Sequence, residues 1–323
     1  MADTPDVTLI ITTYNRAELL REALESVARS RRQPAAGPEV GIEVGIEVLV
    51  VDNNSVDNTA EVVAEIRDGG FPFDLVYLKE GQQGLSFARN CGIAAARGSL
   101  LAFMDDDQLI DEAYLCRLPT LYAETGAACM GGKIAYYNAD GIPAWLAPLI
   151  EDVGQIDLGE GVREMRGATP RDYLKGGNIS FTRAILDQIG GFNTELGRIG
   201  DQLLGGEELE IQDRVIAAGG KVVYHSDLIQ YHLLRPERRF KSYWRRHAYD
   251  WGRSEFEMEK DVYDRSNRLF GAPRTYWWYL ITGDVKRYLG AALRFDAPAR
   301  FQAELRVRQK RGKIAEARRQ FDT

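Results

Sequence analysis

Apolar residues in the first third of the chain alternate between short continuous runs and helical spacing. The runs predict four strands, at Val7–Ile11, Ile46–Val51, Leu75–Leu78 and Leu100–Met104. The helical spacing predicts three helices, at Ala17–Arg32, from Asp57 through Ile66, and at Phe87–Ala96. Strands without polar alternation, separated by amphipathic helices, are typical of a parallel sheet covered on both faces. The sequence therefore predicts an α/β core of the nucleotide-binding type.

The pattern changes after residue 125. Strands and glycine-rich loops lead to a helix expected at Glu208–Ala218 and to short strands expected at Val222–Tyr224 and Leu228–Tyr231. From Phe240 onward the sequence is mainly helical, aromatic and basic. We therefore expect one domain over residues 1–235 and a helical region over 236–323. Within the first domain, a tandem repeat at residues 40–47 is interpreted as a duplication that lengthens a surface loop.

Composition fits an ordinary globular protein, with 45% apolar and 28% charged residues among 323. No apolar run is long enough to span a membrane, and the acidic start has no apolar segment of a secretory signal. Three cysteines without metal-type spacing favour a reducing cytosol. Charge is uneven, because residues 235–323 hold 22 Lys and Arg against 12 Asp and Glu, a net charge of +10 within a chain of net charge −7. This polarity favours contact between the tail and an anionic surface.

Candidate chemistry begins with three consecutive acids, Asp105, Asp106 and Asp107, at the end of a buried strand. Ligands of open α/β sheets bind outside the carboxyl ends of strands. Carboxylates two residues apart in a turn can hold a hard divalent ion that also takes phosphate oxygens. On these residues alone, a solvated acidic turn explains the pattern equally well.

Three further polar segments follow predicted strands or open a helix. They are Thr12-Thr13-Tyr14-Asn15-Arg16, Asp52-Asn53-Asn54-Ser55, and Gly84 through Ala88-Arg89-Asn90. Together with the acidic triplet, they resemble the donor half of family 2 glycosyltransferases, which are inverting enzymes with the GT-A fold. The resemblance covers about residues 5–255. It implies a Rossmann-like, mostly parallel sheet, with residues 1–110 as the nucleotide-sugar half and 111–235 as the acceptor half.

The resemblance implies roles in the donor site. Thr12 and Tyr14 match positions that line the nucleobase, and Asp52 matches the acid that hydrogen-bonds it, usually uracil. Arg89 lies near the nucleotide, while Asp105 and Asp107 face the ribose, the diphosphate and Mn²⁺ or Mg²⁺. The remaining expected nucleotide-sugar contacts are Asn15, Asn54 and Asp106. Taken by itself, Asp52 is equally a turn-forming or helix-capping residue.

The second half supplies the expected acceptor side. Lys175 through Phe181 resembles the family's Gly-x-Asn-x-x-Phe segment, which places Gly177 and Asn178 at the sugar pocket. Trp145 either stacks on a sugar ring or packs in the core. Glu207-Glu208 resembles the family's Glu-Asp pair at a helix start.

An ionised carboxylate at that helix start can take the proton of an attacking acceptor hydroxyl. We expect Glu208 to be this base, with Glu207 as the alternative, and Glu210 to be a helix-dipole partner. His232 is either a third metal ligand or a structural residue. Arg235 and Arg238 either neutralise an anionic group or belong to a solvated basic loop.

The tail has two interpretations. Tyr243–Ser254 resembles a stretch of one bacterial branch of the family, and Arg274–Arg294 combines aromatic with basic residues. Such a segment can lie at a membrane interface, or its aromatic residues can pack on the catalytic domain or on a second subunit of a homodimer. Nucleic-acid binding is not expected, because no recognition motif accompanies the basic residues.

The expected activity is metal-dependent, inverting sugar transfer from a nucleotide-diphospho-sugar, with UDP as the expected nucleotide, to a saccharide or lipid-linked acceptor. This activity would serve surface polysaccharide or glycolipid synthesis in the cytoplasm, with peripheral contact at the inner membrane face. Two alternatives remain open. A non-catalytic nucleotide- or sugar-binding module is compatible with Glu208 in place of aspartate. A sugar nucleotidyltransferase should show a glycine-rich loop after the first strand, where this chain has Thr-Thr-Tyr-Asn-Arg.

Overall fold

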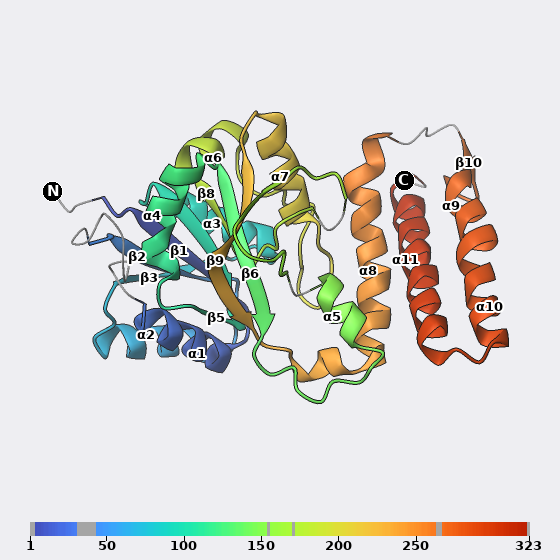
Figure 1. Ribbon diagram of the computed structural model, residues 1–323, viewed down its shortest axis with the longest axis horizontal. Coiled ribbons are helices and arrows are strands. Elements are labelled where there is room, and N and C mark those ends of the chain that lie inside the picture. The colour runs from blue at the N-terminus through green and yellow to red at the C-terminus, as the bar shows by residue number, and fades with distance from the viewer. Residues whose placement is uncertain (1–3, 31–42, 154–155, 170–171, 263–266, 322–323) are drawn as a thin grey trace. The chain divides into compact units, whose positions relative to one another are not determined.

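A computed structural model describes residues 4–30, 43–153, 156–169, 172–262 and 267–321 (Figure 1). The chain forms two compact units. The first contains Met1–Ala139, Ile150–Thr194 and Glu207–Leu233, and the second contains Asp140–Leu149, Glu195–Gly206 and Leu234–Thr323. The last segment of the second unit begins next to the expected boundary at residue 235, but its two inserted segments were not expected from the sequence.

The first unit is built on a nine-stranded sheet. Its order is β3 (Asp74–Lys79), β2 (Ile46–Asp52), β1 (Val7–Thr13), β4 (Leu100–Asp105), β8 (Ile179–Thr182), β6 (Cys129–Tyr136), β9 (Val222–His232) and β5 (Gln108–Ile110), with β7 (Val162–Met165) also paired to β9. Strands β1 to β4 are mutually parallel, as expected from their apolar runs. Strand β8 runs antiparallel to β4 and β6.

Helices cover both faces of this sheet. The helices are α1 (Ala17–Ala28), α2 (Thr59–Asp68), α3 (Leu85–Ala95), α4 (Tyr114–Thr125), α6 (Arg183–Ile189) and α7 (Glu207–Ala217). Leu9 and Ile11 of β1 belong to a core shared with α1, whereas Ile10 belongs to a second core shared with α3. The α/β prediction is therefore confirmed. Gly92 lets α3 approach β1, since a Cβ there would lie 2.5 Å from a methyl carbon of Ile10.

Several expected boundaries are corrected. The first helix ends at Ala28, and residues 31 and 32 of the expected helix lie outside the described residues. The two strands expected between residues 222 and 231 form one strand, Val222–His232, with an irregularity in its pairing to β6. In the tandem repeat, residues 40–42 also lie outside the described residues. The second copy is no surface loop, because Val44 is buried and Ile46 begins β2.

The second unit is mainly helical, as expected. After α5 (Ala147–Val153), which begins in it, come η1 (Pro236–Arg239), α8 (Lys241–Glu259), η2 (Lys260–Val262), the short strands β10 (Arg268–Leu269) and β11 (Ala272–Pro273), α9 (Arg274–Tyr279), the π-helix η3 (Leu280–Val285), α10 (Lys286–Leu293) and α11 (Ala297–Phe321). Helix α11 lies between α8 and the α9–α10 segment (Figure 1). In the described parts of the chain, no helix is long and apolar enough to cross a membrane.

Helices α8 and α11 touch through their backbones. A Cβ on Gly312 would lie 1.9 Å from the carbonyl oxygen of Tyr249, and one on Gly252 would lie 1.8 Å from that of Gln309. Only glycine fits at such a crossing. Arg253 pairs with Glu316 across the same interface at 2.9 Å. The close crossing explains why a polar, basic helix such as α11 holds its place in the unit.

Candidate functional site

Strand register brings the carboxyl ends of β1, β2 and β4 to one edge of the sheet. Thr12 of β1 lies beside Asp105 of β4, and Thr13 lies beside Asp52 of β2. Parallel strands present their carboxyl ends on the same side, where α/β proteins bind ligands. The expected nucleobase and metal residues therefore lie at one edge.

Three side chains at this edge form a candidate metal centre. One ligand atom from each of Asp105, Asp107 and His232 lies within 4.8 Å of the other two. His232 reaches the acidic turn because it pairs with Gln108 between β9 and β5. Two carboxylates and one imidazole suit Mn²⁺, and carboxylates alone also suit Mg²⁺.

The tautomer of His232 favours metal binding. Its Nδ1 lies 2.8 Å from the carbonyl oxygen of Leu233. A carbonyl oxygen only accepts, so Nδ1 carries a proton and Nε2 can keep its lone pair. Nε2 lies 3.5 Å from a carboxylate oxygen of Asp107. This geometry supports the interpretation of His232 as a ligand over that of a purely structural residue.

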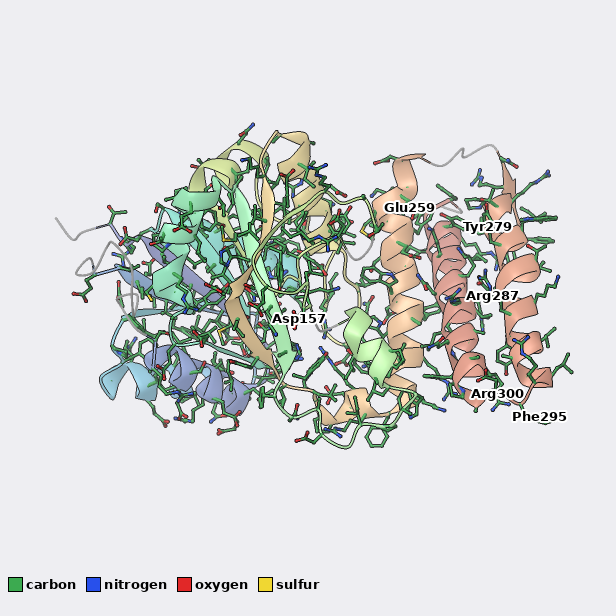
Figure 2. All side chains as sticks on the ribbon, in the orientation of Figure 1. Asp157, Glu259, Tyr279, Arg287, Phe295 and Arg300 are labelled. Atoms are coloured by element: carbon green, nitrogen blue, oxygen red, sulfur yellow. The ribbon has the colours of Figure 1, made fainter. Side chains whose placement is uncertain are left out.

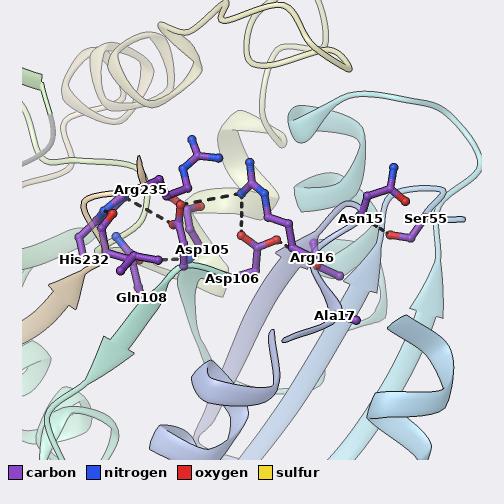
Figure 3. A network of polar contacts seen from close by, with 12 residues as sticks. Asn15, Arg16, Ala17, Ser55, Asp105, Asp106, Gln108, His232 and Arg235 are labelled. Atoms are coloured by element: carbon purple, nitrogen blue, oxygen red, sulfur yellow. Dashed lines mark hydrogen bonds and ion pairs between the residues drawn. The ribbon is translucent and has the colours of Figure 1, made fainter. Parts of the chain in front are cut away.

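Asp106 turns away from the metal ligands. Figure 3 shows it directed to Arg16, whereas Asp105 lies beside Gln108. One oxygen accepts from Arg16 at 2.8 Å and the other accepts from the Thr13 hydroxyl at 2.9 Å. Burial raises the pKa of Asp106 to about 6, against the opposing effect of the Arg16 guanidinium. Asp106 was expected to contact the nucleotide sugar, but both oxygens bind protein groups, so we assign it a positioning role for the acidic turn.

Arg89 of α3 connects the acidic turn to the start of α7. Its side chain is only 2% exposed, and it donates to Glu207 at 2.9 Å and to Asp105 at 3.4 Å. The guanidinium also lies 5.1 Å from the centre of the Phe192 ring. Arg89 was expected near the nucleotide. The structure gives it a second task, which is to hold together two acids that are far apart in sequence.

Gly176 and Gly177 lie against these acids. A Cβ on Gly177 would lie 2.8 Å from an Asp105 carboxylate oxygen, and one on Gly176 would lie 3.3 Å from the Cβ of Glu208 and 3.0 Å from Arg89. The two glycines therefore bring the backbone next to the metal ligands, the arginine and the expected base. That Gly177 borders a sugar pocket stays a prediction.

Asn178 occupies a different environment from the one expected. Its side chain is fully buried, and its oxygen accepts from the Tyr114 hydroxyl at 2.8 Å. Its amide group donates to the carbonyl oxygens of Lys133 and Leu228, each at 3.0 Å. The expected sugar contact is therefore corrected. Asn178 fixes the backbone that carries the neighbouring glycines.

Glu207 and Glu208 differ in their surroundings. Glu207 is buried and held by Arg89. Glu208 is half-buried, and among the residues that the structure describes none forms a hydrogen bond or ion pair with its carboxylate. An accessible carboxylate is better suited to take a proton than one held by a buried guanidinium. Glu210 pairs with Arg214 at 2.8 Å, in keeping with a structural role.

Asp52 combines the two roles that the sequence left open. One oxygen accepts from the Ser55 N–H at 2.7 Å, which is a turn-forming contact, and the other accepts from the Tyr77 hydroxyl at 2.6 Å. Burial and the neighbouring Asp52 carboxylate raise the pKa of Tyr77 above its usual value, so its hydroxyl keeps the proton that it donates. Carboxylate oxygens accept more than one bond, so contact with a nucleobase stays a prediction.

The turns after β1 and β2 are joined through Asn15. Its N–H donates to the Ser55 hydroxyl and its side-chain oxygen accepts from the Val56 N–H, both at 2.8 Å. Asn15 and Asn54 both adopt left-handed backbone conformations, with φ of 52° and 68°. Thr12 is buried and Tyr14 is half-buried beside these turns.

Three expected residues belong to the second unit and are described within it. Trp145 packs edge-on against Phe301, with ring centres 5.2 Å apart, which is the packing alternative. Arg235 and Arg238 are buried, which excludes the alternative of a solvated basic loop and leaves their pairing with an anionic group as a prediction. Burial alone would raise the pKa of Tyr243, but nearby arginines led by Arg238 lower it.

The sequence interpretation missed two contributors to the site. Arg16 and Gln108 flank the acidic triplet in space. Arg16 holds it through its bond to Asp106, and the Gln108 side-chain oxygen accepts from the Asp105 N–H at 3.1 Å. Arg16 could have been found from the sequence, because it is a cation in the turn after the first strand and the three acids end the strand expected beside it. Gln108 follows the triplet directly, but nothing in its sequence context distinguishes it from an ordinary strand residue.

Fold and site together define a glycosyltransferase of the GT-A type. Residues 8–190 match the glycosyl transferase family 2 domain, and the chain belongs to this family. It is 25% identical over 260 residues to the glucosyl-dolichyl phosphate glucuronosyltransferase of Haloferax volcanii. The aligned region covers 74% of each chain.

Two solved structures share the fold. One is the mannosyltransferase PcManGT from Pyrobaculum calidifontis in complex with GDP-Man and Mn²⁺, at a TM-score of 0.62 and 17% identity over 98% of this chain and 88% of that one. The other is S. aureus TarS 1-349 in complex with UDP-GlcNAc, at a TM-score of 0.55 and 18% identity over 94% and 92%. Membership of this family favours a glycosyltransferase over the two alternatives, a non-catalytic binding module and a sugar nucleotidyltransferase.

Proposed function

We propose that this glycosyltransferase inverts the anomeric centre while it moves a sugar from a UDP-sugar to an acceptor hydroxyl, with a divalent metal. One observation carries the proposal. The Gly176-Gly177 turn lies against Asp105, Arg89 and Glu208, so the candidate metal ligands and an accessible carboxylate border one backbone segment. A displacement needs a base for the attacking hydroxyl and a charge-stabilising group for the leaving group, and both kinds of residue border this segment.

Asp105, Asp107 and His232 would hold the metal. When bound, the ion would offset negative charge on the diphosphate leaving group. Imidazole among the ligands favours Mn²⁺ over Mg²⁺. Arg16 and Thr13 keep the acidic turn in the conformation that directs its outer acids to the same place, through their bonds to Asp106.

Glu208 would act as the general base. It would take the proton from the acceptor hydroxyl as the oxygen attacks the anomeric carbon, while the bond from that carbon to the diphosphate oxygen breaks. Glu207 would be a positioning residue, because Arg89 fixes its carboxylate. Arg89 thereby sets the start of α7, and with it the position of Glu208.

Asp52 would bind the nucleobase through its remaining acceptor capacity, with Thr12, Tyr14, Asn15 and Asn54 around it. Uracil offers an N–H donor that matches a carboxylate, and TarS holds UDP-GlcNAc in its solved complex. Guanine also offers N–H donors, and PcManGT holds GDP-Man. A panel that includes both nucleotides therefore tests the choice of UDP.

We place the acceptor among saccharides and lipid-linked sugars, in surface polysaccharide or glycolipid synthesis. The name of the Haloferax relative states that its acceptor is a glucosyl-dolichyl phosphate, which supports a lipid-linked acceptor. We place the reaction in the cytoplasm at the inner membrane face. The three cysteines are free thiols, which agrees with a reducing compartment.

Replacing Glu208 with glutamine tests the proposed base. Glutamine keeps the shape but cannot take the proton, so donor turnover with Mn²⁺ should fall about 10²–10⁴-fold while the Kd for UDP stays unchanged. Glu210→Gln is the matched control on the same helix, where only a pair with Arg214 is lost. If Glu208→Gln turns over like Glu210→Gln, while Glu207→Gln is inactive and still binds UDP, then Glu207 is the base.

A further inference from the structure

Helices α9 and α10, with the π-helix between them, leave an apolar face uncovered. We define the outer face as Trp278, Ile281, Leu289, Leu293 and Phe295, which are 67%, 63%, 55%, 80% and 94% exposed. The opposite side of the same segment is also apolar. Tyr276 is buried there with Phe256 and Ile314, and Leu280 packs against them. A helix that is apolar on both sides normally has a partner for each.

The π-helix contributes to the outer face. In a regular α-helix, Ile281 and Leu289 would point about 80° apart, because each residue turns by about 100°. The wider turns of a π-helix rotate the chain less per residue, which brings the two side chains closer to the same direction. Asp284, the acid of the π-helix, is buried, and its carboxylate lies 3.6 Å from the Arg287 guanidinium. The π-helix therefore directs apolar side chains to the outer face and buries its one acid, Asp284.

Exposed cations follow the same stretch of chain, from Arg274 to Arg300 at the start of α11. Arg274, Lys286, Arg287, Arg294 and Arg300 are exposed along the same segment. The exposed acid within it is Asp296, whose carboxylate accepts from the Ala299 N–H at the start of α11. Figure 2 shows Tyr279, Arg287 and Phe295 along this segment, and Arg300 at the start of α11. The stretch of residues 274–300 is thus basic, with five exposed cations against one exposed acid, in a chain whose net charge is −7.

We propose that the outer face docks on the surface of an anionic phospholipid bilayer. Trp278, Leu293 and Phe295 would enter the boundary between headgroups and acyl chains, and the cations would lie among lipid phosphates. A second copy of this chain fits less well. A two-fold interface on this stretch would bring the exposed cations of both copies together, with one exposed acid on each copy to neutralise them. The docking surface rests on the proposed function for its purpose, which is to bring the enzyme to a lipid-linked acceptor.

Co-sedimentation of the full-length protein with vesicles tests the proposal. We expect binding to vesicles of equimolar phosphatidylcholine and phosphatidylglycerol, and weak binding to phosphatidylcholine alone. The Leu293→Ser/Phe295→Ser double variant should lower the partition coefficient at least about tenfold, since each exposed apolar side chain contributes by burial. The Lys286→Gln/Arg294→Gln variant should lose binding to the anionic vesicles selectively. Val162→Ser, which changes a 57%-exposed side chain of β7, is the matched control and should bind like the wild type.

Three results would overturn the proposal. The wild type does not sediment with the anionic vesicles, the double variant sediments as the wild type does, or light scattering finds a dimer that the double variant abolishes. The last result assigns the outer face to a subunit interface. Calorimetric titration of the double variant with UDP and Mn²⁺ separates this proposal from the proposed function. Nucleotide binding that persists in a variant without vesicle binding shows that only docking was lost.

Discussion

Replacing Arg89 with methionine tests whether this residue holds the two acidic parts of the site together. Methionine keeps much of the length of the side chain but removes the charge and its five donors. The change removes Arg89 from its ion pair with Glu207, whose side chain is 6% exposed. The carboxylate of Asp105 is less affected, because its side chain is 33% exposed and water can solvate it.

The expected cost follows from this burial. Removing one partner of a buried ion pair lowers the free energy of unfolding by about 3–5 kcal/mol, because an uncompensated charge remains. Adding Glu207→Gln removes that charge, so the double variant should be more stable than the sum of the single changes predicts. The coupling should fall within about 0.5–3 kcal/mol. Arg21 and Glu65 form the control pair, with side chains 31% and 65% exposed, and breaking it should cost below about 1 kcal/mol.

Urea unfolding followed by far-ultraviolet circular dichroism is the assay. Tryptophan fluorescence does not report on this change, because all five tryptophans lie in the second unit and Arg89 lies in the first. Additive effects of Arg89→Met and Glu207→Gln would refute the bridge. A cost for Arg89→Met as small as that of the control pair would refute it as well.

Gly177→Ala should raise the Kd for Mn²⁺ severalfold, because its Cβ would lie 2.4 Å from the side-chain nitrogen of buried Gln108 and 2.8 Å from an Asp105 carboxylate oxygen; unchanged calorimetric titration would contradict this. Gly312→Ala should lower the unfolding midpoint followed by tryptophan fluorescence, since its Cβ would lie 1.9 Å from a backbone oxygen of α8. Gly290→Ala, in α10 with no atom within 4 Å, should be neutral or stabilise by up to about 1 kcal/mol. Burial would raise the pKa of Glu47, but hydrogen bonds from the Arg97 backbone, the Thr8 hydroxyl and the Arg97 side chain lower it. Its stabilising effect should therefore be complete above the ordinary glutamate pKa of about 4.3 and be lost as the pH falls through the folded-state value, and Glu47→Gln should flatten that part of the stability–pH curve.

The strands of the donor half could be predicted because their apolar runs are continuous and end in polar turns. Once these strands are parallel, their carboxyl ends must meet, which is why Thr12, Asp52 and Asp105 were placed together correctly. The direction of a side chain within a turn could not be predicted in this way. Asp106 and Asn178 belong to the same motifs as Asp105 and Gly177. Their side chains nevertheless form hydrogen bonds with protein groups in place of a ligand.

Long-range connections account for the rest of what the sequence did not reveal. The bridge through Arg89 joins residues of β4, α3 and α7, and no local pattern records such a contact. The inserted segment Glu195–Gly206 is held by hydrogen bonds to α8, such as that from the Leu203 N–H to Asp250 at 3.0 Å, and the segment Asp140–Leu149 packs through Trp145 on Phe301 of α11. Their sequences look like ordinary loops of the first unit.

Calorimetric titration with UDP, in the presence and absence of Mn²⁺, tests the central claim most directly. We predict binding that depends on Mn²⁺ and that the Asp105→Asn/Asp107→Asn variant loses while its circular dichroism spectrum stays unchanged. GDP in place of UDP is the comparison, and selective binding of GDP would keep the metal centre but change the donor. Nucleotide binding of equal strength without metal, or in the double variant, would contradict the account.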